Sequence, residues 1–235
     1  MSDARRSWKV PLLVATLTTA LVTALSYGLP DAYAATGVGL AFLAVTYAVA
    51  LRQRAPDPPA HYGLALGGLL EPEPLSLRRL LTDGARALAW GAGMALIVFP
   101  PFWLGWLYWW HPHQAFHPAP PPSFSQDVLG QLLVIALPEE AFYRGYLQTS
   151  FDDAFRGRVR VLGAELGPGI LIASALFALG HIATEVHPNR LAVFFPALVF
   201  GWLRVRTRGI GAGMVFHALS NLLTAYLAHS YMLGR

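Results

Sequence analysis

The sequence predicts an all-α fold, a polytopic transmembrane helix bundle with about seven membrane helices, within a range of six to eight. Of the 235 residues, 55% are hydrophobic and only 13% are charged, whereas a soluble domain carries about 25% charged residues. The mean hydropathy is +0.45. Long uncharged intervals alternate with arginine clusters along the chain. These three observations together exclude an ordinary soluble enzyme.

Seven apolar segments are the candidate membrane helices, because a helix needs about 20 apolar residues to cross the hydrocarbon layer. Five carry no charge: Val10–Pro30, Ala32–Leu51, Ala87–Gln126, Leu166–Thr184 and Gly209–Gly234. Two are shorter or interrupted: Val128–Tyr146 and Leu191–Leu203. No separable soluble domain is evident. We therefore expect a single integral membrane domain over 1–235, with N-terminal helices and loops in 1–126 and a catalytic helix core in 127–235.

The basic residues indicate the orientation, because cytoplasmic loops collect Lys and Arg. With seven crossings, nearly all of them fall on the side of the amino terminus, in clusters around Arg6, Arg54, Arg158 and Arg206. We expect a multi-pass protein with a cytoplasmic amino terminus and an uncleaved first helix. Its arginine-rich, lysine-poor composition suggests a bacterial plasma (inner) membrane. The lipid bilayer is thus a predicted partner and nucleic acid is not.

Two further stretches allow more than one interpretation. The segment Leu75–Leu88 has helical spacing of apolar and arginine positions, and is either a helix on the membrane surface or the solvated start of the third membrane helix. The loop His111–Ser125 contains three histidines that are candidate metal ligands. An interfacial loop beside an aromatic belt explains those histidines more simply. The belt consists of Trp103, Trp106, Trp109 and Trp110.

A few polar residues stand within the predicted helices, where they are costly unless they pair or function. They are Glu139, Glu140, Arg144, His181, His217 and Asn221. A spacing of four places Glu140 with Arg144, and His217 with Asn221, on single helical faces. None of these groups suits lipid, so three helices are expected to present them to a shared water-filled pocket. Pro138 removes a backbone donor directly before the acidic pair.

The residue types suggest hydrolysis. The chain has no cysteine, which excludes disulfides, zinc fingers and a thiol nucleophile, and no Ser–His–Asp set is evident. A carboxylate beside a histidine can hold and deprotonate water. A histidine and an asparagine can donate hydrogen bonds to a developing oxyanion. The set therefore indicates amide hydrolysis inside a membrane cavity.

At these positions the chain resembles a known family. Glu139 to Arg144 fits the pattern Glu-Glu-x-x-x-Arg, Phe177 to His181 fits Phe-x-x-x-His, and His217 to Asn221 fits His-x-x-x-Asn. In this order they resemble the CAAX protease and bacteriocin-processing (CPBP) family of glutamic-type intramembrane endopeptidases, which includes the type II CAAX prenyl endopeptidase. The bacterial myxosortases are a subgroup to which the chain is also similar.

The resemblance implies a catalytic set in which Glu139 and His181 activate water, while His217 and Asn221 stabilise the oxyanion. It implies supporting roles for Glu140, Arg144 and Phe177. The implied substrate is a membrane-anchored protein or peptide, cut near its C-terminus. No cofactor is required. Relatives are often described as metalloendopeptidases, so zinc on Glu139, His181 and His217 is the alternative.

Two other functions stay open. The same residues and fold would serve a non-catalytic membrane scaffold or bacteriocin-immunity-type protein that binds a peptide without cutting it. Intramembrane Glu and His also form proton relays, so a proton-coupled transporter is the third interpretation.

Overall fold

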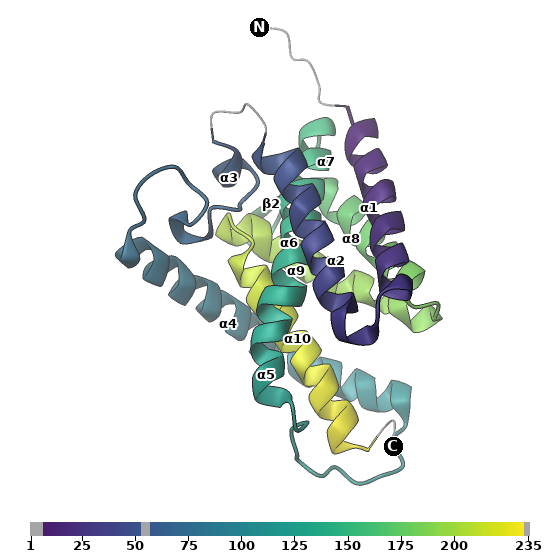
Figure 1. Cartoon of the computed structure of the whole chain (residues 1–235). Helices are drawn as coiled ribbons and strands as arrows, with labels where there is room; N and C mark the ends of the chain where they lie inside the picture. The colour runs from purple at the N-terminus through teal and green to yellow at the C-terminus, as the bar shows by residue number, and fades with distance from the viewer. Residues whose placement is uncertain (1–6, 53–56, 233–235) are drawn as a thin grey trace, which may run out of the picture.

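Helices make up most of the structure, a computed structural model that describes residues 7–52 and 57–232 (Figure 1). The first half contains α1 (Lys9–Gly28), α2 (Asp31–Thr46) with its π-helical extension η1 (Tyr47–Leu51), α3 (Pro58–His61), the 3-10 turn η2 (Leu66–Gly68) and α4 (Leu77–Trp110). The second half contains α5 (Phe124–Leu129), η3 (Gly130–Ala136), α6 (Leu137–Glu140), η4 (Ala141–Gln148), α7 (Thr149–Ala154), β1 (Val159–Val161), β2 (Ala164–Leu166), α8 (Gly169–Thr184), η5 (Pro188–Val193), α9 (Phe194–Thr207) and α10 (Gly211–Ser230). The predicted all-α class is confirmed.

Each of the seven predicted apolar segments contains a helix. Within the two described ranges, three helices are long and apolar enough to cross a membrane: α1, α2 with η1, and α4. Helix α8 is apolar but shorter. Large apolar side chains point outward from these helices, with Leu17 62% exposed, Leu40 62% and Leu96 79%. A contiguous apolar surface of this kind suits lipid rather than water.

Helix α4 settles the interpretation of Leu75–Leu88. Ser76 is its N-cap residue, and its Oγ accepts a hydrogen bond from the backbone N–H of Arg79 at 3.4 Å. From Leu77 the helix continues without a break for 34 residues. Most of the segment is therefore the first part of the third long helix, and it is not a separate surface helix.

The predicted aromatic belt is only partly exposed. Trp109 is 61% exposed and Trp110 49%, as expected for side chains at a membrane interface. Trp106 is instead 6% exposed and packs with Leu227 and Tyr231 against α10. Trp106 is thus mainly a packing residue.

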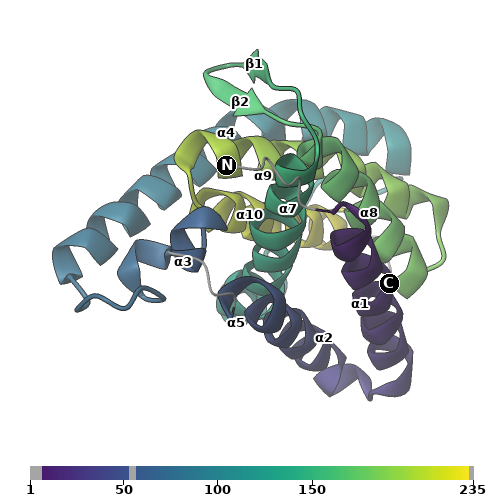
Figure 2. The ribbon, with the colours of Figure 1, turned by 90° about the horizontal axis from the view of Figure 1, so that it is seen from above.

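The hairpin β1–β2 is the one element of regular strand among the described residues, and it projects from the rim of the bundle (Figure 2). Its antiparallel register pairs Val161 with Ala164, and the two-residue turn between them has positive φ at Leu162 (47°) and Gly163 (78°). This is the turn geometry that matches the twist of a hairpin. Trp202 of α9 donates a hydrogen bond from Nε1 to the Val161 carbonyl at 3.0 Å and so holds the hairpin to the bundle.

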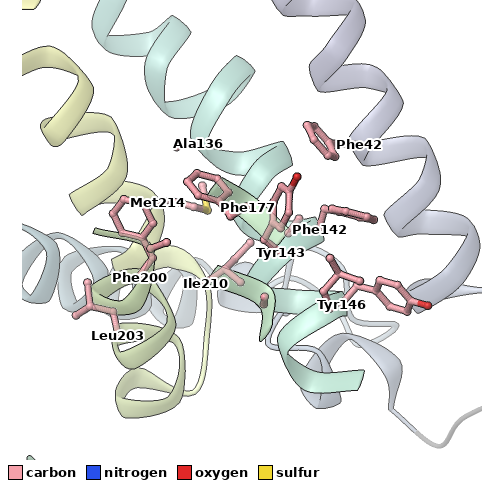
Figure 3. Packing of buried hydrophobic residues seen from close by; sticks show 14 of the residues in the cluster. Phe42, Ala136, Phe142, Tyr143, Tyr146, Phe177, Phe200, Leu203, Ile210 and Met214 are labelled. Atoms are coloured by element: carbon pink, nitrogen blue, oxygen red, sulfur yellow. The ribbon is translucent and has the colours of Figure 1, made fainter. Parts of the chain in front are cut away.

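The segments α5, η3, α6, η4 and α7 form one continuous helix, the central helix (residues 124–154), which contacts α2, α8, α9 and α10. All eight residues of η4 are buried. Figure 3 shows the rings of Phe142, Tyr143 and Phe177 lying next to one another in this core. The central helix is therefore surrounded by protein where it carries its polar residues.

Candidate active site

Wide turns of the central helix flank the acidic pair. Pro138 has no N–H to donate, and η3 and η4 are π-helical segments on either side of the short α6 that contains it. Wide turns of this kind occur where the regular hydrogen-bond ladder is interrupted, often at functional sites. The interruption expected at Pro138 is present, and Glu139 and Glu140 lie directly before the second wide segment.

Glu140 is completely buried and joins two other polar residues. Its Oε1 accepts a hydrogen bond from Nδ1 of His217 at 3.1 Å. Its Oε2 lies 3.5 Å from Nε of Arg144, one helical turn away, and both side chains are 0% exposed. An ionised carboxylate offers only acceptors, so Nδ1 of His217 carries the hydrogen. Glu140 thus fixes the orientation of His217 as well as pairing with Arg144.

Glu139 lies on the other side of the same imidazole. Its Oε2 is 3.8 Å from Nε2 of His217, and its side chain is 15% exposed, in contrast to that of Glu140. The ring of His217 also stacks on Phe200 of α9, with centroids 4.7 Å apart and planes at 10°. The central helix and α10 therefore bring two carboxylates to one histidine, as the sequence predicts for a shared polar interior.

His181 approaches the group from α8. Its Nδ1 donates a hydrogen bond to the carbonyl of Phe177 at 2.9 Å, which leaves Nε2 as an acceptor. The Phe177 ring lies 4.3 Å from the His181 ring and 6.0 Å from the His217 ring, measured between centroids. Phe177 therefore contacts both imidazoles, and the local bond fixes the tautomer of His181.

Asn221 has a partner that the sequence analysis did not single out. Its Nδ2 donates a hydrogen bond to Oε1 of Gln131 on η3 at 2.8 Å. Gln131 is an uncharged polar residue in the apolar segment Val128–Tyr146, and Gln148 lies two residues after that segment. Neither glutamine is ionisable, so attention to mainly ionisable groups does not identify them. Counting glutamine, like asparagine, among the costly intramembrane groups would have identified Gln131.

Arg144 is held by aromatic rings as well as by Glu140. Its guanidinium carbon lies 5.1 Å from the ring centroid of Phe177 and 5.7 Å from that of Phe200. These distances are within the range of cation–π attraction. Arg144 thus connects α8 and α9 to the central helix.

The zinc alternative is not supported by the arrangement of these side chains. Within residues 7–52 and 57–232, no three His, Cys, Asp or Glu side chains come together as ligands for a metal ion. We therefore derive no step through a metal.

A pocket of about 220 Å³ opens where the central helix ends. It is lined by Gln148, Thr149, Asp152, Asp153, Arg158, Glu165, Arg204 and Val205. Burial raises the pKa of Asp152, although the Gly169 N–H and Arg158 oppose that change. Burial also lowers the pKa of Arg204 to about 10. This pocket lies more than two helical turns along the chain from Glu139, whereas the sequence analysis expected a wet pocket at the acidic pair itself.

Comparison with known protein families gives one match, which covers this part of the chain. Residues 121–223 match the family model described as type II CAAX prenyl endopeptidase Rce1-like. This segment is similar to the CAAX protease family. No curated protein and no solved structure is similar enough to give a match of its own.

The matched segment contains every residue of the candidate site, from Gln131 to Asn221. Helices α1 and α2 and the whole of α4 lie before it. This similarity and the three long apolar helices together indicate a multi-pass membrane protein. Glu139, His181, His217 and Asn221 are the side chains on which a specific mechanism can be proposed.

Proposed function

We propose that this protein is a CAAX-type protease that hydrolyses a peptide bond near the C-terminus of a membrane-anchored protein, with Glu139 as general base. The observation that carries the proposal is the difference between the two glutamates. Glu140 is completely enclosed and bound to both His217 and Arg144, whereas Glu139 is partly exposed and faces His217 at 3.8 Å. The less constrained carboxylate is the one able to meet a water molecule and a substrate.

The proposed reaction begins with a water molecule between Glu139 and Nε2 of His181. Glu139 takes one proton from this water while its oxygen bonds to the carbonyl carbon of the substrate. The carbonyl oxygen then becomes an oxyanion. When the carbon–nitrogen bond breaks, the proton returns from Glu139 to the leaving nitrogen, which departs as an amine, and the other fragment is a carboxylic acid.

The oxyanion would be stabilised from α10. Nδ1 of His217 already donates to Glu140, so donation to the oxyanion requires a hydrogen on Nε2 and hence the protonated imidazole. Asn221 has two hydrogens on Nδ2, and Gln131 accepts only one of them. The second is available to an oxyanion. Donors held in place before the reaction are the most effective form of such stabilisation.

The substrate class follows from the location of the site. A polar group of this kind between membrane helices is accessible to a chain segment that is itself anchored in the bilayer. We infer a bacterial plasma-membrane location with a cytoplasmic amino terminus, because the arginine clusters of the sequence fall on one side. A prenylated C-terminus and the C-terminal anchor of an exported protein are the two substrates to compare.

The test uses purified protein in liposomes with peptides of both kinds, and mass spectrometry of the fragments. Glu139→Gln and His181→Ala are expected to abolish cleavage while the thermal unfolding midpoint stays close to that of the wild type. Glu73→Gln, at an exposed carboxylate far along the chain, is the matched control and should cleave normally. Cleavage by Glu139→Gln at the wild-type rate would refute the proposal. Peptide binding by the wild type without fragments would identify a scaffold instead.

A further inference from the structure

A line of buried polar atoms that make no hydrogen bond with the described protein runs from the candidate active site towards the pocket at the end of the central helix. The atoms are Glu139 Oε2, Glu140 Oε2, Nε, Nη1 and Nη2 of Arg144, Gln148 Oε1 and Ser174 Oγ. We call the five residues that carry them the inner polar file. Each atom is shielded from bulk solvent and makes no hydrogen bond within the described protein.

Three residues of the inner polar file share one face of the central helix. Glu140, Arg144 and Gln148 follow one another at intervals of four, and Asp152 continues the series into the pocket. Contacts with α9 confirm the common face. Arg144 lies over the ring of Phe200, and Gln148 Nε2 donates to the carbonyl of Gly201 at 3.1 Å.

Ser174 joins this face from α8. The backbone N–H of Gly169 donates to Asp152 Oδ1 at 2.8 Å, and Arg144 stacks on Phe177, so α8 runs antiparallel to the central helix. Ser174 lies between Gly169 and Phe177 and is therefore at the level of Gln148.

The contacts of Ile170, one helical turn before Ser174, show which side of α8 Ser174 occupies. A Cβ placed on Gly201 would lie 2.6 Å from Ile170 Cγ1 and 2.7 Å from Gln148 Oε1. Ile170 therefore packs against α9 next to the carboxamide of Gln148. Because Ser174 follows Ile170 by four residues, its hydroxyl faces the same place.

This many buried polar atoms without hydrogen bonds would be costly. Buried polar groups that make no hydrogen bond with protein normally bind ordered water instead. The file also has the composition that a chain of water molecules needs. Carboxylate and carboxamide oxygens accept, the guanidinium donates, and the hydroxyl of Ser174 does both.

We propose that the inner polar file is a hydrated route that supplies water from the pocket lined by Gln148 and Asp152 to Glu139. The inference rests on the proposed function for its purpose, because a hydrolase inside a bilayer consumes one water per bond cut and has no bulk solvent beside it. Water enters the route at the arginine-rich end of the bundle. A substrate bound on the other side of Glu139 does not block this route.

The test exploits the absence of cysteine from the sequence. Ser174→Cys is an isosteric change, and Ag⁺, which is close to water in size, forms a stable bond with a thiolate that it can reach. Ala173→Cys is the matched control, because both residues are 0% exposed but neighbouring helical residues point about 100° apart. Free thiol left after timed exposure to Ag⁺ is titrated in denaturant. We expect Ser174→Cys to react at least ten times faster than Ala173→Cys.

A second substitution tests the entrance. In the Ser174→Cys background, Gln148→Leu is expected to slow the reaction with Ag⁺ several-fold, while Gln148→Glu preserves it. In the protein without cysteine, Gln148→Leu should lower kcat with KM unchanged. Equal, slow reaction of Ser174→Cys and Ala173→Cys would overturn the route. The accessibility assay needs no catalysis and can be repeated in Glu139→Gln, so its failure is distinct from failure of the protease proposal.

Radiolytic labelling of the wild type gives a measurement that depends on no substitution. Hydroxyl radicals formed from bound water oxidise side chains next to that water. Phe177 lies against Arg144, while Phe142 faces Phe42 and Tyr146, and their exposed fractions are 1% and 0%. Greater oxidation of Phe177 than of Phe142 is expected, and equal oxidation would contradict the hydrated route.

Discussion

His217 donates a hydrogen bond from Nδ1 to Oε1 of Glu140 at 3.1 Å, although the two residues are 77 positions apart in the chain. The bond joins α10 to the central helix at the point where Arg144 also contacts Glu140. One carboxylate therefore holds a histidine and an arginine at once, and its neighbour Glu139 is left free of both tasks. The two adjacent glutamates consequently have separable roles.

Substitution of Glu140 should mainly lower stability, whereas substitution of Glu139 should mainly abolish cleavage. Glu140→Ala leaves the buried Arg144 cation without its partner, a change that costs about 3–5 kcal/mol. We expect a clear fall in the thermal unfolding midpoint measured in detergent. Glu139→Ala should keep that midpoint within a few degrees and lose cleavage. Equal destabilisation by the two substitutions would contradict this division.

The ion pair between Glu140 and Arg144 should show strong coupling. Arg144→Met and Glu140→Gln each leave the other charged residue buried without its partner, while the double variant removes both charges together. A double-mutant cycle of unfolding free energies should give an interaction of about 1–3 kcal/mol, within the range for residues in direct contact. Additive effects within about 0.5 kcal/mol would show that the pair is not coupled.

Gly213 of α10 is expected to be intolerant of a side chain. A Cβ there would lie 3.0 Å from Glu140 Oε2, so Gly213→Ala should displace the carboxylate and reduce both stability and cleavage. Gly93 of α4 is the matched control, since nothing lies within 4 Å of its Cβ position. Gly93→Ala should be neutral or stabilising by about 0.5–1 kcal/mol, because alanine is the better helix former.

Gln131 should act as a positioning residue for Asn221. Gln131→Leu removes the acceptor of the Asn221 amide, and we expect kcat to fall about tenfold, which corresponds to about 1.4 kcal/mol. Gln131→Glu keeps an acceptor oxygen and should restore most of the rate. A purely structural role would lower the unfolding midpoint in both variants without this rescue.

Chelation distinguishes the proposed glutamate mechanism from the metal alternative. Because Glu139, His181 and His217 do not meet as a set of ligands, cleavage should persist after treatment with phenanthroline and after dialysis against a chelator. Loss of activity on chelation, with recovery on adding zinc, would require a different arrangement of these side chains.

The helices could be predicted because an apolar segment of about 20 residues has few alternatives. The candidate site was partly predictable for a related reason, since every polar residue in such a segment is conspicuous. The hydrogen bond between Glu140 and His217 could not be predicted. Spacing along a helix places Glu140 beside Arg144 but carries no information about contacts with α10. Local patterns cannot supply contacts made only by the packing of distant helices.

The hairpin β1–β2 was missed for a different reason. Its strands have three residues each and include Arg160 and Glu165, so the segment has the composition of a loop. Its stability depends on a two-residue turn and on the bond from Trp202 to Val161. Neither device produces a hydrophobic period that a sequence analysis could detect.

Helix α8, which carries His181, has 16 residues and therefore measures about 24 Å, whereas the hydrocarbon layer is about 30 Å thick. Lipid beside a short helix compresses to cover it, at a cost of fractions of a kcal/mol per ångström of mismatch. The bilayer should consequently be thinner next to His181. This thinning shortens the distance that an anchored substrate must travel to enter the candidate active site. Acyl-chain length would then regulate turnover, with short-chain lipids favouring the enzyme over long-chain ones.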